Sequence, residues 1–337
     1  MSTLHHQAPA RSSEPLLAVR DLRVTFARRG EEPFRAVDGI SFDVRPGQTV
    51  GLVGESGCGK SVTSLAIMGL LPHRGNTVEG SAVFDGEDLL TMSQAELRNR
   101  RGRDIAMIFQ DPLSSLNPVI SIGRQVTEVM ERHQGLSRRA AVPKAAELLD
   151  RVGIPDSTAR LANYPHQLSG GMRQRALIAM ALACNPRLLI ADEPTTALDV
   201  TIQAQILALL KDLVVDTGTA LMMITHDLGV VAGLCDEVNV LYGGKIVERG
   251  GRHGLFKRPQ HPYTVGLLHS IPRLDAARGE KLSPIPGSVA DNLPWTSACA
   301  FAPRCPRVLD TCTSRMPPWE GDDVVGHRCF NPMGGPR

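Results

Sequence analysis

Aromatic side chains are scarce in this chain: only 4% of its 337 residues are Phe, Trp or Tyr, although 42% are hydrophobic. A core built from such a sequence must be largely aliphatic, which is typical of α/β folds whose parallel strands are buried on both faces. An excess of one sign of charge is also lacking, because the formal net charge is only +2. So small a charge does not by itself indicate a nucleic-acid partner, and we expect none.

A long apolar run is missing as well. The sequence has no stretch of eighteen apolar residues, so nothing in it is expected to span a membrane. Residues 1–15 contain no apolar core of the kind that a signal peptide needs, and we expect them to form a disordered lead-in. The chain is therefore expected to be made and kept in the cytosol.

The strongest signal is a glycine-rich stretch, residues 54–61, that fits the pattern G-x-x-x-x-G-K-S/T at every fixed position. A short β-branched run, 49–53, precedes it and a helical pattern, 62–69, follows it. In that context the alternative, a glycine-rich turn with a chance Lys-Ser pair, is disfavoured. Backbone N–H groups, the helix dipole and the Lys60 charge would bind phosphate, and the Ser61 hydroxyl would bind Mg²⁺. The predicted nucleotide-binding residues here are Gly54, Glu55, Ser56, Gly57, Cys58, Gly59, Lys60, Ser61 and Val62.

A second signal is an apolar run, 188–191, that ends in two carboxylates, Asp192 and Glu193. Asp192 fits a side chain that holds Mg²⁺ through water, and Glu193 fits the residue that polarises the attacking water. The alternative is an acidic strand end that only caps nearby amides. The phosphate loop upstream favours the catalytic interpretation.

Two more polar residues follow apolar runs, Gln110 after 105–109 and His226 after 220–225. Gln110 is predicted to reach Mg²⁺ or the attacking water. His226 is predicted to sense the γ-phosphate, although a lone His is more often structural. Phe26, upstream of the phosphate loop, either stacks on an adenine ring or is an ordinary core residue.

A second helix start has the features of an anion site. Ser169, Gly170 and Gly171 open the strongly helical run 173–183, so free N–H groups and the helix dipole point outward. The surrounding region, about 111–180, is predicted to be a helical insertion. Because the two phosphate-binding helix starts lie more than a hundred residues apart and each is complete, they predict a dimer that shares its sites.

In this order, the motifs resemble those of the nucleotide-binding subunits of ABC transporters over roughly residues 16–270. The resemblance implies an α/β fold, a P-loop NTPase of the ABC type with a helical insertion, which binds ATP and Mg²⁺ and hydrolyses ATP. It also implies that Phe26 stacks on adenine and that Asp199 belongs to the nucleotide site. Met172 ends the second motif where the family most often has Gln, but the Ser-Gly-Gly before it is intact, so we expect an active enzyme.

Four further stretches narrow the resemblance to the ATPases of bacterial dipeptide, oligopeptide and nickel permeases, and within them to the D-type subunit. These stretches are 109–112, 115–118, 164–172 and 256–264. The resemblance implies a paralogous ABC ATPase as heterodimer partner, with a second copy of this chain as the alternative. It also implies two transmembrane permease subunits, an extracellular substrate-binding protein, and a peripheral position on the cytoplasmic face of the inner membrane. The predicted function is ATP-driven uptake of di- or oligopeptides, with nickel or glutathione import as alternatives.

The tail, residues 271–337, carries four of the seven cysteines in the pattern C-x5-C-x6-C-x16-C. They are Cys299, Cys305, Cys312 and Cys329. In the cytosol such a group indicates a metal site rather than disulfides, with a handful of buried thiols as the alternative. Structural zinc favours pairs two to four residues apart, so the wider spacing favours a 4Fe–4S cluster over zinc. Permease ATPases with this tail are associated with such a cluster, whose expected role is structural. The other cysteines, Cys58, Cys184 and Cys235, are predicted to be inert.

Other ABC ATPases serve DNA repair, chromosome maintenance and translation. The first two kinds usually carry long coiled coils or zinc-finger insertions, and the translation factors carry two ATPase halves with a charged linker. This chain has one set of motifs, no long heptads and no basic tail, which disfavours that class. A regulatory module with an inactive ATPase is disfavoured by the intact Glu193 and His226.

Overall fold

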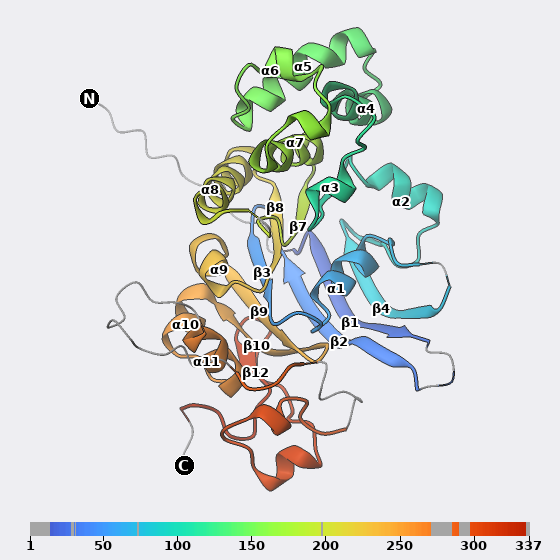
Figure 1. The fold of residues 1–337 in the computed structure, drawn as a ribbon. Coiled ribbons are helices and arrows are strands. Elements are labelled where there is room, and N and C mark those ends of the chain that lie inside the picture. Colours follow the sequence, from blue (N-terminus) through green and yellow to red (C-terminus); the bar gives the residue numbers. More distant parts are fainter. Residues whose placement is uncertain are drawn as a thin grey trace, which may run out of the picture.

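In the computed structural model, the described residues of the chain form two β-sheets with helices around them (Figure 1). The structure describes residues 14–27, 30, 32–72, 74–196, 198–270, 285–289 and 297–334. The predicted lead-in, residues 1–15, therefore lies outside the described residues except for its last two positions. Within the described ranges, no helix has the length and apolar character that crossing a bilayer requires.

The larger sheet has eight strands, and its central part is parallel. In spatial order they are β11 (Glu320–Gly321), β12 (Gly326–His327), β10 (Lys245–Gly251), β9 (Glu237–Tyr242), β3 (Thr49–Val53), β8 (Ala220–Thr225), β7 (Leu188–Asp192) and β6 (Ile105–Ile108). The strands from β9 to β6 run parallel, whereas β10, β12 and β11 extend the sheet antiparallel. The predicted strands over 49–53 and 220–225 are confirmed to the residue.

Side chains of the parallel strands alternate between two hydrophobic cores. In β7, Leu188 and Ile190 belong to the core shared with the smaller sheet, whereas Leu189 and Ala191 belong to the core under the helices. All residues of β7 are buried. Because both faces of the sheet are covered, its sequence is a continuous apolar run without polar alternation.

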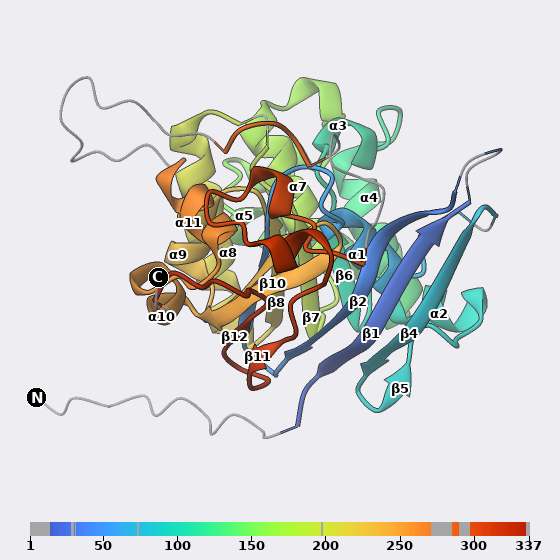
Figure 2. The ribbon, with the colours of Figure 1, turned by 90° about the horizontal axis from the view of Figure 1, so that it is seen from below.

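The smaller sheet is antiparallel, with an exposed face and a buried face (Figure 2). Its strands, in spatial order, are β2 (Phe34–Val44), β1 (Leu17–Phe26), β4 (Asn76–Phe84) and β5 (Glu87–Asp88). Apolar and polar residues alternate over 16–26, a pattern that predicts a half-exposed strand. β1 has this character, since its Leu17, Val19, Leu22 and Val24 are buried. Helix α1 (Lys60–Ile67) contacts both sheets, because Ile67 shares a core with side chains of each. The phosphate-loop helix is thereby fixed between two layers.

A group of helices lies at one end of the molecule, at the top of Figure 1. It comprises α3 (Pro112–Ser115), α4 (Ile122–Gln134), α5 (Arg138–Arg151), α6 (Ser157–Arg160) and α7 (Gly170–Leu182). These helices fall in the region predicted to be a helical insertion. They pack around a core that includes Val126, Leu149 and Ile178 and that continues under β6 and β7.

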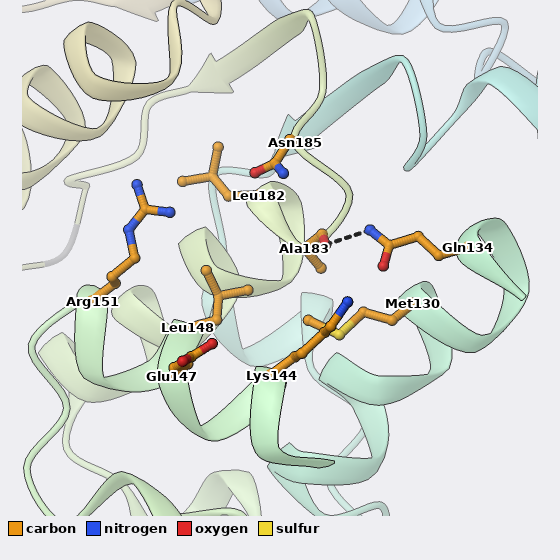
Figure 3. Close-up of a pocket in the computed structure, with 9 residues that line it drawn as sticks. All are labelled: Met130, Gln134, Lys144, Glu147, Leu148, Arg151, Leu182, Ala183 and Asn185. Carbon is orange, nitrogen blue, oxygen red and sulfur yellow. Dashed lines mark hydrogen bonds between the residues drawn. The ribbon is translucent and has the colours of Figure 1, made fainter. Parts of the chain in front are cut away.

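A surface pocket of about 410 Å³ opens between α4, α5 and the end of α7 (Figure 3). Lys144 and Arg151 of α5 line it, and the Gln134 side chain donates a hydrogen bond to the Ala183 carbonyl at 3.2 Å across it. None of its lining residues belongs to the predicted nucleotide site. The pocket is therefore separate from the phosphate loop.

The C-terminal part is continuous with the larger sheet. Its strand β12 pairs with β10, so that His327 lies opposite Glu248. Phe301 packs against Tyr242 of β9 and Tyr263, with ring centroids 5.1 and 5.3 Å apart. The helices of this region are α10 (Arg252–Lys257) and α11 (Pro262–His269).

Several elements were not expected from the sequence. Among them are β9, β10 and the short helices α2 (Gln94–Arg100) and α9 (Leu228–Leu234). α2 does carry a local start signal, a capping box in which the Ser93 side chain and the Glu96 carboxylate bond to each other's backbone N–H.

Candidate nucleotide-binding site

The phosphate loop connects β3 to α1, as predicted. Two of its glycines are required by close backbone contacts as well as by positive φ. At Gly54 (φ +156°) a Cβ would lie 2.3 Å from the Leu241 carbonyl oxygen, and at Gly59 (φ +103°) it would lie 2.3 Å from that of Ala36. Only glycine fits at either position without moving the backbone. The loop therefore presents its N–H groups at the start of α1.

Lys60 is buried beneath this loop and bonds to it. Its Nζ donates to the carbonyl oxygens of Gly54 at 2.8 Å and of Glu55 at 3.0 Å. The Cys58 thiol, also buried, lies 3.9 Å from the same ammonium group. Burial raises the pKa of Cys58, which favours the protonated thiol. That this thiol is inert stays a prediction.

Ser61 and Asp192 meet although they lie on different elements. The Ser61 hydroxyl donates to Asp192 Oδ1 at 3.0 Å. Burial raises the pKa of the Asp192 carboxyl, so its negative charge has less stabilisation than in water. A buried carboxylate beside a hydroxyl oxygen is a donor set that suits a hard cation such as Mg²⁺. These two of the predicted Mg²⁺ ligands are thus adjacent.

Side chains that follow the ends of three strands come together at Glu193. Its carboxylate accepts a hydrogen bond from Gln110 Nε2 at 3.2 Å, and its Oε1 lies 3.2 Å from His226 Nδ1. Gln110 therefore contacts Glu193 rather than Ser61 or Asp192. Of the two roles predicted for Gln110, the position favours orienting the attacking water over binding Mg²⁺.

Thr196 completes this group and was missed from the sequence. Its hydroxyl donates to Glu193 Oε2 at 2.8 Å. The available signal was a hydroxyl residue three positions after the second carboxylate, in the turn that follows β7. Glu193 itself has φ +45°, a left-handed conformation that is uncommon for a residue with a side chain. Its N–H donates to the Ile224 carbonyl at 2.8 Å, which anchors the turn to β8.

The second helix start lies apart from the phosphate loop. Ser169 caps α7, its hydroxyl accepting the Met172 N–H at 3.3 Å, and Ser169 and Gly170 are exposed. Figure 1 shows α7 and α1 in different parts of the molecule. A Cβ on Gly171 would lie 2.8 Å from Ile202 of α8 (Val200–Thr217). The structure therefore does not bring the two predicted phosphate-binding helix starts together within one chain.

Asp199 and Phe26 have local roles in this structure. Asp199 caps α8, since its Oδ1 accepts the Ile202 N–H at 2.9 Å. Phe26 is half-buried at the end of β1 and packs against the core of the smaller sheet. Whether either residue also contacts nucleotide stays a prediction.

Three of the four tail cysteines share one feature: their sulfur atoms accept backbone N–H groups. Arg307 N–H donates to Cys305 Sγ, Leu309 N–H to Cys312 Sγ and Asn331 N–H to Cys329 Sγ, each at 3.4 Å. Burial raises the pKa of the Cys299 thiol to about 11. In the part of the chain that the structure describes, no three His, Cys, Asp or Glu side chains are close enough to hold one metal ion.

A phosphate loop between a parallel strand and a helix, with a carboxylate pair at the end of β7, two strands away in the same sheet, defines a P-loop nucleoside triphosphatase. Comparison with known protein families identifies the class of protein more narrowly. The sequence profile of the ABC transporter family matches residues 37–196, and that of the oligopeptide/dipeptide transporter C-terminal region matches 247–312.

Relatives match over nearly the whole chain. A peptide import ATP-binding protein of Brucella melitensis is 52% identical and covers 95% of this chain and 98% of its own length. The oligopeptide transport ATP-binding protein OppD of Salmonella typhimurium is 48% identical (97% and 96%), and the dipeptide transport ATP-binding protein DppD of Bacillus subtilis is 51% identical (90% and 90%).

Solved structures agree. The dimeric, post-hydrolysis ATP-binding cassette MJ0796, bound to ADP and phosphate, has a TM-score of 0.63 and 28% identity and covers 70% of this chain and 98% of its own. The chain belongs to the family of ABC-transporter ATP-binding proteins and is an ATPase of that type.

Proposed function

We propose that this chain is the ATP-hydrolysing subunit of an importer that takes up di- or oligopeptides. One observation carries the proposal: an ABC ATPase site and an oligopeptide/dipeptide-type C-terminal region occur in the same chain. The names of the relatives support it, since OppD and DppD are oligopeptide and dipeptide transport proteins. Nickel and glutathione remain alternative substrates. No observation favours a role in DNA repair or translation.

In the proposed mechanism, the phosphate loop and Lys60 bind the triphosphate, and Ser61 and Asp192 bind the Mg²⁺ that accompanies it. Glu193 accepts a proton from the attacking water while Gln110, Thr196 and His226 hold its carboxylate in place. Such catalysis needs positioning and charge neutralisation but no covalent intermediate.

The exposed Ser169-Gly170-Gly171 helix start would bind the γ-phosphate held by a second ATPase subunit. We propose that this partner is a paralogue, that closure of the pair drives two membrane-spanning permease subunits, and that an extracellular binding protein delivers the substrate. The chain would therefore work as a peripheral subunit on the cytoplasmic face of the membrane.

Replacement of Glu193 by Gln tests the catalytic assignment. The amide keeps the shape and the acceptor for Thr196 but is a poor proton acceptor, so we expect kcat for ATP hydrolysis to fall by about 10²-fold or more with the KM for ATP little changed. Glu87→Gln, the same change at an exposed carboxylate paired with Arg100, is the control. A Glu193→Gln enzyme that retains most of its kcat would contradict the role.

Uptake of a radiolabelled peptide by cells lacking this chain tests the transport function. We expect the wild-type chain to restore uptake and Lys60→Ala to fail, because the ammonium group that neutralises phosphate is gone. Lys211→Ala, at an exposed position of α8, is the matched control and should restore uptake fully. Restored nickel or glutathione uptake without peptide uptake would overturn the peptide assignment.

We also propose that Cys299, Cys305, Cys312 and Cys329 hold a 4Fe–4S cluster, in which each thiolate would bind a different iron. Zinc, the alternative, would need the thiolates around one ion, and among the described residues no three such side chains lie that close. Four thiolates suit such a cluster, and N–H groups that donate to the sulfurs stabilise their negative charge. The cluster would hold together a segment whose described residues form only short 3₁₀ helices and two-residue strands.

Metal analysis and visible absorption of protein purified without oxygen test this proposal. We expect a broad visible absorption with about four irons per chain. Cys312→Ser should abolish both, whereas Cys184→Ser, a half-buried thiol in the turn after α7, should leave them unchanged. One zinc per chain without colour, or no metal at all, would rule the cluster out.

A further inference from the structure

Arg304, a residue of the C-terminal part, contacts the phosphate loop through its side chain. The Arg304 guanidinium faces the carboxylate of Glu55, the first variable residue of the loop, with Nη1–Oε2 at 2.7 Å and Nη2–Oε1 at 2.9 Å. Two parallel contacts of this kind are the fork geometry by which Arg recognises a carboxylate. They join positions 249 residues apart in the chain.

The guanidinium itself has a fixed orientation. Its Nε donates to the Pro286 carbonyl at 2.7 Å, and its Nη2 donates to the Gly287 carbonyl at 3.0 Å. Nη1 also lies within hydrogen-bond distance, 3.3 Å, of the Tyr242 hydroxyl. The Arg304 side chain is only 3% exposed. A planar guanidinium with these partners has one orientation. It differs in this from a mobile surface charge, whose ion pair contributes little to stability.

Glu55 is also held through its backbone. Its N–H donates to the hydroxyl of Tyr263, a buried residue of α11, at 2.8 Å. Its carbonyl oxygen accepts the Lys60 ammonium. The residue that Arg304 orients is therefore in direct contact with the lysine on which phosphate binding depends.

We propose that Arg304 is a positioning residue for the phosphate loop: by orienting Glu55 it holds the loop in the shape that receives the triphosphate of ATP. Arg304 immediately precedes Cys305, so the cysteine-bearing segment and the nucleotide site are linked through one side chain. In the alternative, the pair only fastens the C-terminal part to the ATPase, and its loss lowers stability without changing the affinity for ATP.

Steady-state ATP hydrolysis by full-length Arg304→Met, Arg304→Lys and Arg307→Met chains separates these two cases. Arg307 is the matched control, because its guanidinium lies in the same segment but donates to Asn331. For Arg304→Met we expect the KM for ATP to rise about tenfold while kcat changes less than about twofold. Arg304→Lys, which keeps the charge but loses the fork, should give a smaller rise, and Arg307→Met none.

An unchanged KM in Arg304→Met, or an equal rise in Arg307→Met, would overturn the proposal. Glu55→Gln gives a second test that does not depend on Arg304→Met being able to fold. We expect Glu55→Gln to raise the KM for ATP, and the double variant Glu55→Gln/Arg304→Met to raise it no further than Arg304→Met alone. Effects of the two changes that multiply would show that the residues act independently and would also overturn the proposal.

Discussion

The parallel pairing of β3, β8, β7 and β6 is the constraint on which the rest of the structure depends, because it brings four strand ends to one edge of the sheet. The sequence has a glycine-rich or polar segment directly after each of these ends. As a result Ser61 meets Asp192, and Glu193 meets both Gln110 and His226. A shift of one residue in the pairing of any of these strands would turn its side chains to the opposite face of the sheet, and these contacts would be lost.

The strand ends at this edge of the sheet lie in buried surroundings. This explains how the edge can hold a strained backbone and a carboxylate that is shielded from water. β7 and β8 are buried along their whole length, between two aliphatic cores. Such packing holds Glu193 in a left-handed conformation, a state that costs on the order of 1–3 kcal/mol. The same packing shields the Asp192 carboxylate from water. In such buried surroundings a nearby positive charge stabilises a carboxylate most. At the phosphate loop, the Glu55–Arg304 pair adds a restraint that comes from the C-terminal part.

Much of this arrangement could be predicted, because its signals are local. The strands at 49–53 and 220–225 are apolar runs with clear limits, and the two helix starts carry glycine and serine. The pairing of β12 with β10 and the contact of Arg304 with Glu55 could not be predicted, since each joins segments that only the folded chain brings together. Thr196 is only three positions from Glu193, but this spacing alone does not show that its hydroxyl turns back to that carboxylate. The sequence does not indicate β10, because this strand is not an apolar run. Its Glu248 and Arg249 are charged residues that become buried only when other elements cover them.

Ser169 lies on a helix apart from α1, and association driven by ATP tests most directly the proposal that two ATPase subunits share their nucleotide sites. The measurement is sedimentation of the full chain carrying Glu193→Gln, mixed with the second ATPase subunit of its transporter. With ATP and Mg²⁺ we expect one species of the summed mass, and we expect an added Ser169→Arg change to prevent its formation. Binding of ATP without association, or association that is indifferent to Ser169→Arg, would contradict a shared site.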